Sequence, residues 1–163
     1  MAGYGDDSGF AAWLSENGYT LPEDAPAAAV LRQRGSVYVD GQYGGRFVGL
    51  PAAGYAQERQ WPRVGAVAGG QPIPNDVVPP AVINASYEAA LQEARDPASL
   101  SVIGSSAVRV KREKVEGAVE VEYQSASADQ DFVASIAPVM TIIEGMLVPY
   151  LRMTEPGLGL WAV

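Results

Sequence analysis

PPAVINASYEAALQEAR, residues 79–95, is a helix-forming stretch with apolar side chains on two sides. The prolines suit the first turn, and Asp96-Pro97 ends the helix, because the residue before proline is disfavoured in helical conformation. A helix that is apolar on two sides is expected to lie between other elements. One stripe consists of Ile83, Tyr87, Ala90, Leu91 and Ala94, and the other of Val82, Ala85 and Ala89.

Two helices are predicted before this stretch. The first has Phe10, Trp13 and Leu14 on one face, with Asp7 or Ser8 as the N-cap and Asn17-Gly18 at its end. The second begins in Pro22–Pro26, with Asp24 as the cap and Pro26 in the first turn. Gly41, Gly44 and Gly45 are expected to end this second helix. Residues with helical spacing lie along one of its faces, and their apolar members are predicted to pack inward. These residues are Ala27, Val30, Leu31, Arg34, Val37 and Tyr38.

A last helical pattern runs from Phe132 to Leu151, where Pro138 and Pro149 are expected to break or kink it. The fold class predicted from these elements is mainly α: a small helical bundle with one β-hairpin and long loops. The chain has 163 residues, of which 48% are hydrophobic, and this favours a single domain over 1–163. We expect the bundle core at about 7–95 and 131–152, the hairpin at 108–123 and an extended C-terminal tail at 153–163.

The predicted hairpin, VRVKREKVEGAVEVEY over residues 108–123, has one basic arm and one acidic arm. Alternation of apolar and charged residues indicates two strands joined at a glycine turn. A two-residue turn would place Lys111 opposite Glu122, and a three-residue loop would place Arg112 opposite Glu120. The pattern does not choose between these registers.

Such a ribbon is marginally stable alone, and its edges are open to further strands. One interpretation is an intramolecular hairpin whose mixed charges serve solubility. The other is strand pairing with another copy or a partner. The candidate interface residues are Lys111, Arg112, Lys114, Glu120 and Glu122.

Residues 49–80 are predicted to be mainly loop, with Gln60-Trp-Pro-Arg63 as a compact anchor. Trp61 either fills a hole in the fold while Arg63 stays in solvent, or both residues form an interface anchor, since Trp and Arg dominate interaction hot spots. The tail PGLGLWAV, with Leu160 and Trp161, either covers the chain's own core or inserts into a neighbour.

The residue inventory argues against an enzyme. The chain has no Cys and no His, which excludes thiolate metal sites, cysteine nucleophiles, Ser-His-Asp triads and imidazole bases. Neighbouring carboxylates fall where helix caps or solvated strand positions are expected. The glycines of Asp40–Arg46 lack the GK[ST] ending that phosphate binding needs. We therefore expect no catalytic residues, no metal and no cofactor.

The net charge of −8 is opposite to that of a generic nucleic-acid binder. The start of the chain lacks the pattern of a signal peptide. The longest apolar region, Phe132–Leu151, is interrupted by prolines, Glu144 and Gly145 and is a poor membrane span. No membrane partner is expected.

Four stretches in order give the sequence a family resemblance. They are Tyr38–Tyr43 with Arg46-Phe47 and Gly49, then Gln60–Gly65, then Ile73–Ala81 running to Leu91, and Val110–Tyr123. They resemble the head–tail connector adaptor proteins of tailed bacteriophages, often labelled "DnaT-like single-stranded DNA-binding protein".

The resemblance implies a mostly helical subunit with one hairpin and no active site. Copies would form a dodecameric ring below the portal protein, which extends the DNA channel and docks the next neck or tail protein. Genomic double-stranded DNA would pass through without specific binding. The implied location is the neck of the virion, between capsid and tail, and the host cytoplasm during assembly.

The alternative function is a single-stranded DNA-binding replication accessory protein, as the family label suggests. It would need a basic groove with stacking aromatic side chains. Tyr87 and Tyr123 are the candidates for stacking near the basic arm.

Overall fold

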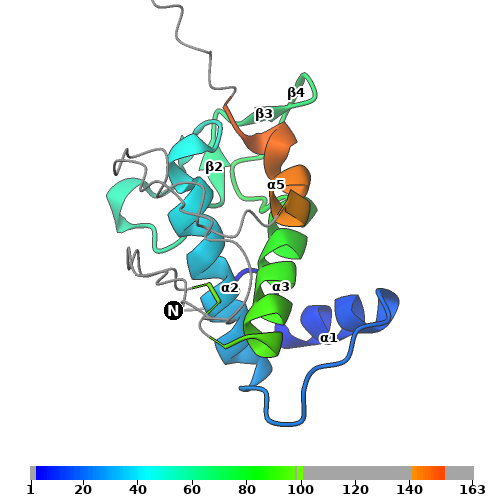
Figure 1. Ribbon diagram of the computed structural model, residues 1–163. Helices are drawn as coiled ribbons and strands as arrows, with labels where there is room; N and C mark the ends of the chain where they lie inside the picture. The colour runs from blue at the N-terminus through cyan, green and yellow to red at the C-terminus, as the bar shows by residue number, and fades with distance from the viewer. Residues whose placement is uncertain (1–2, 98, 101–140, 153–163) are drawn as a thin grey trace, which may run out of the picture. The chain divides into compact units, whose positions relative to one another are not determined.

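The computed structural model describes residues 3–97, 99–100 and 141–152, and these all belong to one compact unit (Figure 1). The helices are α1 (Asp7–Glu16), α2 (Ala28–Tyr43), α3 (Pro80–Arg95) and α5 (Thr141–Leu147). Short 3-10 helices are η1 (Gly44–Arg46), η2 (Gly54–Ala56) and η3 (Val148–Tyr150). The described part is thus mainly α, as predicted. The predicted hairpin at 108–123 lies outside the described residues.

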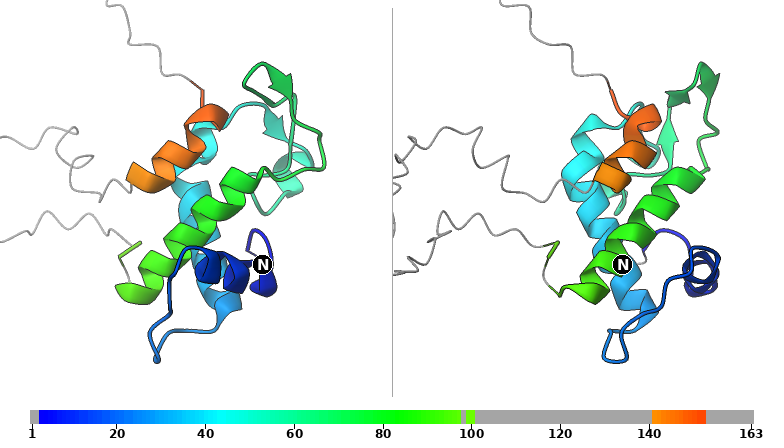
Figure 2. Two further views of the ribbon diagram at one scale, coloured as in Figure 1. Left: turned by 90° about the vertical axis from the view of Figure 1, so that its right-hand side faces the viewer. Right: turned by 45° about the vertical axis from the view of Figure 1, so that its right-hand side comes forward.

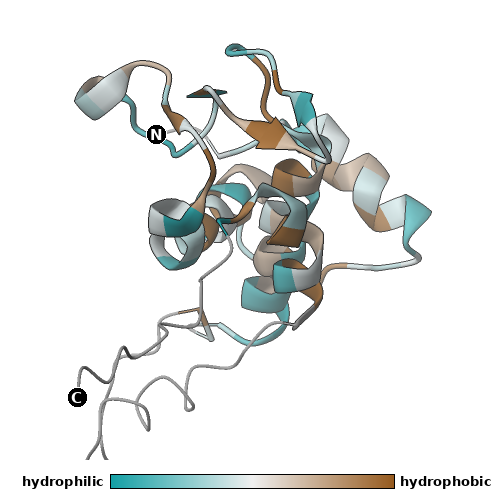
Figure 3. Cartoon of the chain, turned by 90° about the horizontal axis from the view of Figure 1, so that it is seen from above, coloured by the Kyte–Doolittle hydropathy of each residue, from teal (hydrophilic) through white to brown (hydrophobic). Residues whose placement is uncertain are grey.

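Two small antiparallel sheets lie in the loop between α2 and α3. The first pairs β1 (Leu50–Pro51) with β2 (Arg63–Val64), and the second pairs β3 (Val67–Ala68) with β4 (Gln71–Pro72). The expectation of mainly loop is confirmed, but these pairs were not predicted. Brown segments in Figure 3 show that hydrophobic residues occur on the strands as well as on the helices.

The central position of α3 is confirmed. Val82, Ala85 and Ala89 belong to one buried cluster, with Val39 and Tyr43 of α2 and Ile143 of α5. The other stripe of α3 packs with α1 and the start of α2 in a second cluster. That cluster contains Phe10, Trp13, Leu14, Leu31, Tyr87, Ala90, Leu91 and Ala94. Helix α1 therefore packs at the end of the α2–α3 pair away from the strands (Figures 1 and 2).

Helices α2 and α3 run antiparallel and approach each other closely at Gly35 (Figure 1). A Cβ atom built there would lie 2.2 Å from the Ser86 carbonyl oxygen and 2.8 Å from the Ala90 nitrogen. Only a residue without a side chain allows this approach, so Gly35 is required by the crossing of the helices. By contrast, a Cβ atom at Gly41 would meet nothing within 4 Å.

The predicted inward face of α2 is only partly confirmed, since Leu31 is buried and Tyr38 packs half-buried against the core. Val30 and Val37 are exposed, whereas Arg32, Gly35 and Ser36 are buried together with Leu31. Arg32 can be buried because its guanidinium donates to Asp7 Oδ1 at 2.7 Å and to the carbonyl of Gly5 at 2.8 Å. These bonds offset the cost of removing the charge from water.

Several predicted helix ends are also corrected. The N-cap of α1 is Asp6, whose carboxylate accepts from the Gly9 amide at 2.7 Å, rather than Asp7 or Ser8. Helix α2 begins after Ala27 without a side-chain cap, so Asp24 does not cap it, and Gly41 lies inside it. At the other end of the chain, α5 changes to the 3-10 helix η3 around Pro149, as its proline predicted.

Candidate functional site

Trp61 and Arg63 were predicted as either a loop plug or an interface anchor, and the structure buries both. Trp61 is 2% exposed, and its ring meets Phe47 and Tyr150 edge-on at 5.7 and 6.1 Å between centroids. Its peptide bond to Pro62 is cis. Trp61 therefore fills a hole between the loop, η1 and η3, as the plug interpretation expected.

The expectation that Arg63 stays in solvent is wrong, since it is 3% exposed. Its guanidinium donates to the carbonyls of Val48, Gly49 and Gln60 at 2.8 to 3.0 Å. Burial lowers the pKa of Arg63 below its ordinary value, but these carbonyls satisfy the charged form. The interface role of the two residues stays a prediction, and in the described chain neither is on the surface.

A buried polar network joins the N-terminal segment to α2 and the loop. The Tyr4 hydroxyl donates to Asp40 Oδ1 at 2.5 Å and accepts from the Trp61 amide at 3.1 Å. Burial and the neighbouring Asp40 carboxylate raise the pKa of Tyr4 far above its usual range, so it stays a donor. Burial also raises the pKa of Asp40, although Tyr4 and Arg59 act against this. The network fixes three segments and offers no open reaction site.

The arginines of the described residues all have partners within the fold. Four form ion pairs with carboxylates: Arg32 with Asp7, Arg34 with Glu93, Arg46 with Glu144 and Arg59 with Asp40. Arg63 and Arg152 donate to backbone carbonyls, and Arg95 lies 4.9 Å from the centre of the Tyr19 ring. The chain's two lysines, Lys111 and Lys114, lie outside the described residues. Within the described residues, therefore, every arginine side chain already has a partner in the protein, and none is left unpaired for a phosphate.

The other predicted interface residues lie in the parts of the chain that the structure does not describe. Lys111, Arg112, Lys114, Glu120, Glu122, Leu160 and Trp161 lie outside the described residues, and so does Tyr123. The prediction that Tyr87 stacks against a nucleic-acid base is wrong, because Tyr87 is 3% exposed. Its ring packs against Phe10 with 5.2 Å between ring centroids.

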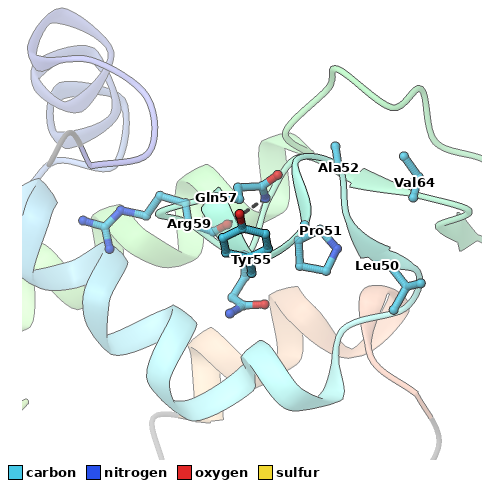
Figure 4. Close-up of a pocket in the computed structure, with 9 residues that line it drawn as sticks. Leu50, Pro51, Ala52, Tyr55, Gln57, Arg59 and Val64 are labelled. Carbon is cyan, nitrogen blue, oxygen red and sulfur yellow. Dashed lines mark hydrogen bonds between the residues drawn. The ribbon is translucent and has the colours of Figure 1, made fainter.

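A groove that the sequence did not predict lies between β1, η2 and β2 (Figure 4). It is an open cavity of about 640 Å³ lined by Leu50, Pro51, Tyr55, Gln57 and Val64, among others. The Tyr55 side chain is fully exposed, and Leu50 is 63% exposed. Exposed aromatic and aliphatic side chains beside a groove are typical of a protein contact surface.

The described residues contain no cluster of three acidic side chains that could hold a metal ion. Within the same part of the chain, no helix is both long and apolar enough to cross a bilayer.

Comparison with known protein families gives one match for this chain. The profile of a family described as "Putative DnaT-like ssDNA binding protein" matches residues 4–163. The chain belongs to this family. Searches of curated proteins and of solved structures each gave no match. The resemblance to proteins labelled DnaT-like is thus confirmed, while the match says nothing about a head–tail connector.

Proposed function

We propose that this member of the DnaT-like family is a structural adaptor of a tailed bacteriophage, which acts through contacts with other protein subunits. Copies would form a ring, dodecameric by resemblance, below the portal protein and would dock the next neck or tail protein. DNA would pass through this ring without being held. The proposed location is the virion neck, reached from the host cytoplasm during assembly, and no reaction is catalysed.

The proposal rests on the observation that the arginines of the described part are paired within the chain. In the described part each arginine is engaged by a carboxylate, a carbonyl or an aromatic ring of the same chain, and the whole chain has a net charge of −8. A surface that grips nucleic acid needs cations directed at phosphates. An acidic surface instead lets DNA slide, because it limits sticking.

Exposed apolar side chains support the same proposal. Val37 on α2, Ile142 on α5 and Val148 on η3 are at least half exposed. A ring uses heterologous contacts, in which one patch meets a different patch on the next copy. Separate apolar patches on different elements suit that geometry.

Charge reversal of the basic arm tests the proposal. The triple variant Lys111→Glu, Arg112→Glu and Lys114→Glu is expected to weaken assembly far more than folding. Each exposed ion pair contributes up to about 1 kcal/mol, so losing three at one subunit contact would weaken it by about 100-fold. Native mass spectrometry with the portal protein measures assembly, and thermal melting measures folding.

The matched control for this test is Lys111→Arg with Lys114→Arg, which keeps the charge and should assemble normally. A triple variant that loses folding and assembly to the same degree would contradict the proposed role of the arm.

A second candidate, single-stranded DNA binding, is favoured by the description of the family, and the comparisons support it better than they support the connector. Its phosphate contacts would have to come mainly from Arg109, Lys111, Arg112 and Lys114, because the arginines of the described part are engaged. The exposed ring of Tyr55 could supply base stacking. It predicts binding that weakens steeply with salt.

A further inference from the structure

The groove between β1, η2 and β2 is held in shape by the loop's own hydrogen bonds. The Gln57 side chain accepts from the Ala53 amide at 2.9 Å and donates to the carbonyls of Arg59 and Pro62 at 2.7 and 2.9 Å. Arg59 also lines the groove, and its guanidinium pairs with Asp40 of α2 (Figure 4). The groove is therefore preformed, and a ligand entering it would not need to order the loop.

The aliphatic part of the groove suits an apolar segment, and the cation that lines the groove, Arg59, is already paired with Asp40. Leu50, Pro51 and Val64 form its aliphatic walls, and the Tyr55 ring stands beside them. Two of these side chains are mostly exposed, so the described chain leaves apolar surface uncovered here. Covering that surface with apolar side chains is favourable, because it removes apolar area from water.

The described chain ends beside this groove. The Arg152 amide donates to the Arg46 carbonyl at 2.7 Å, and its guanidinium donates to the Gly49 carbonyl at 3.3 Å. Gly49 directly precedes Leu50, which lines the groove. The eleven residues that follow Arg152 read MTEPGLGLWAV, and their last six, residues 158–163, have no charged side chain.

The length of this segment is sufficient to reach the groove. Arg46 and Leu50 are four residues apart, so at most about 14 Å separates the point of departure from the groove. The six residues from Arg152 to Leu158 can span about 20 Å when extended. A segment tethered so closely has an effective concentration in the millimolar range at the groove, far above that of a free partner.

We propose that the C-terminal segment Leu158–Val163 docks into the groove of its own chain, with Leu160 and Trp161 placed against Leu50, Pro51 and Tyr55. Of the two interpretations of the tail, the proposal favours docking within the same chain over insertion into a neighbour. It also names the residues that the tail would contact. The inference rests on the groove and on the end of the described chain, and it does not depend on the proposed function.

Disulfide trapping tests this docking, and the absence of native cysteine makes the test clean. The double variant Ala52→Cys with Ala162→Cys places one thiol at the groove and one in the tail. The control is Ala29→Cys with Ala162→Cys, whose first thiol is on the exposed start of α2, at the end away from the strands. All three substitutions replace alanine, and the two in the described part are at exposed positions, so the fold should be retained.

Under mild oxidation at micromolar protein, the groove pair is expected to form an intramolecular disulfide at least ten-fold faster than the control pair. Non-reducing gels separate the compact cross-linked monomer from other species. Equal rates for the two pairs would overturn the proposal. A cross-linked dimer as the main product would overturn it as well, because the tail would then occupy the groove of a second copy.

Discussion

Replacement of Gly35 by alanine is expected to lower the free energy of unfolding by about 3 kcal/mol. The added Cβ atom would lie 2.2 Å from the Ser86 carbonyl oxygen and 2.8 Å from the Ala90 nitrogen. Both are backbone atoms of α3, so a side-chain rotation cannot relieve the overlap. The helices must separate, and this loosens the buried clusters on both sides of α3. Urea denaturation followed by circular dichroism measures the loss.

The matched control is Gly41→Ala on the same helix. The new methyl group would meet nothing within 4 Å, and alanine is a better helix former than glycine. This variant is expected to gain about 0.5 to 1 kcal/mol. Similar effects of the two substitutions, in either direction, would show that the close packing of α2 on α3 does not require glycine at position 35.

Replacement of Trp61 by alanine is expected to cost about 3 to 5 kcal/mol. The indole is 2% exposed and packs edge-on against Phe47 and Tyr150, so its removal leaves a cavity among residues from distant parts of the chain. The loss should appear as a large decrease in the midpoint of urea unfolding, measured by circular dichroism.

Val37→Ala is the control for this substitution, because it removes apolar atoms from a side chain that is 51% exposed. Its effect is expected to stay within about 0.5 kcal/mol. A folded Trp61→Ala variant as stable as Val37→Ala would contradict the assignment of Trp61 to the core. It would instead favour the interface anchor as the main role of the indole.

Prediction from the sequence worked where the pattern was local. The two stripes of α3 are regular, and prolines mark both of its ends, so its position between two buried clusters could be predicted. The prediction of the buried face of α2 failed in part because that face contains Arg32, Gly35 and Ser36, which a search for hydrophobic residues does not select. Arg32 is accepted there only because Asp7 and backbone carbonyls of the N-terminal segment surround it.

The groove could not be predicted for a similar reason. The exposure of Leu50 and Tyr55 depends on the pairing of β1 with β2, whose partner residues are twelve to fourteen positions apart in the chain. Nothing in the sequence around Tyr55 distinguishes it from a buried tyrosine. The predicted interface residues of the charged ribbon and of the tail lie outside the described residues, so they stay predictions.

The central claim is that this chain acts by contact with other proteins and does not hold nucleic acid. Fluorescence anisotropy of a labelled single-stranded oligonucleotide, titrated with the protein over a series of salt concentrations, tests it most directly. We expect a dissociation constant weaker than about 0.1 mM at physiological salt, which is beyond the usual range of non-specific binding. Micromolar binding whose logarithmic salt slope is near −3, as about four phosphate contacts to Arg109, Lys111, Arg112 and Lys114 would give, would contradict the claim.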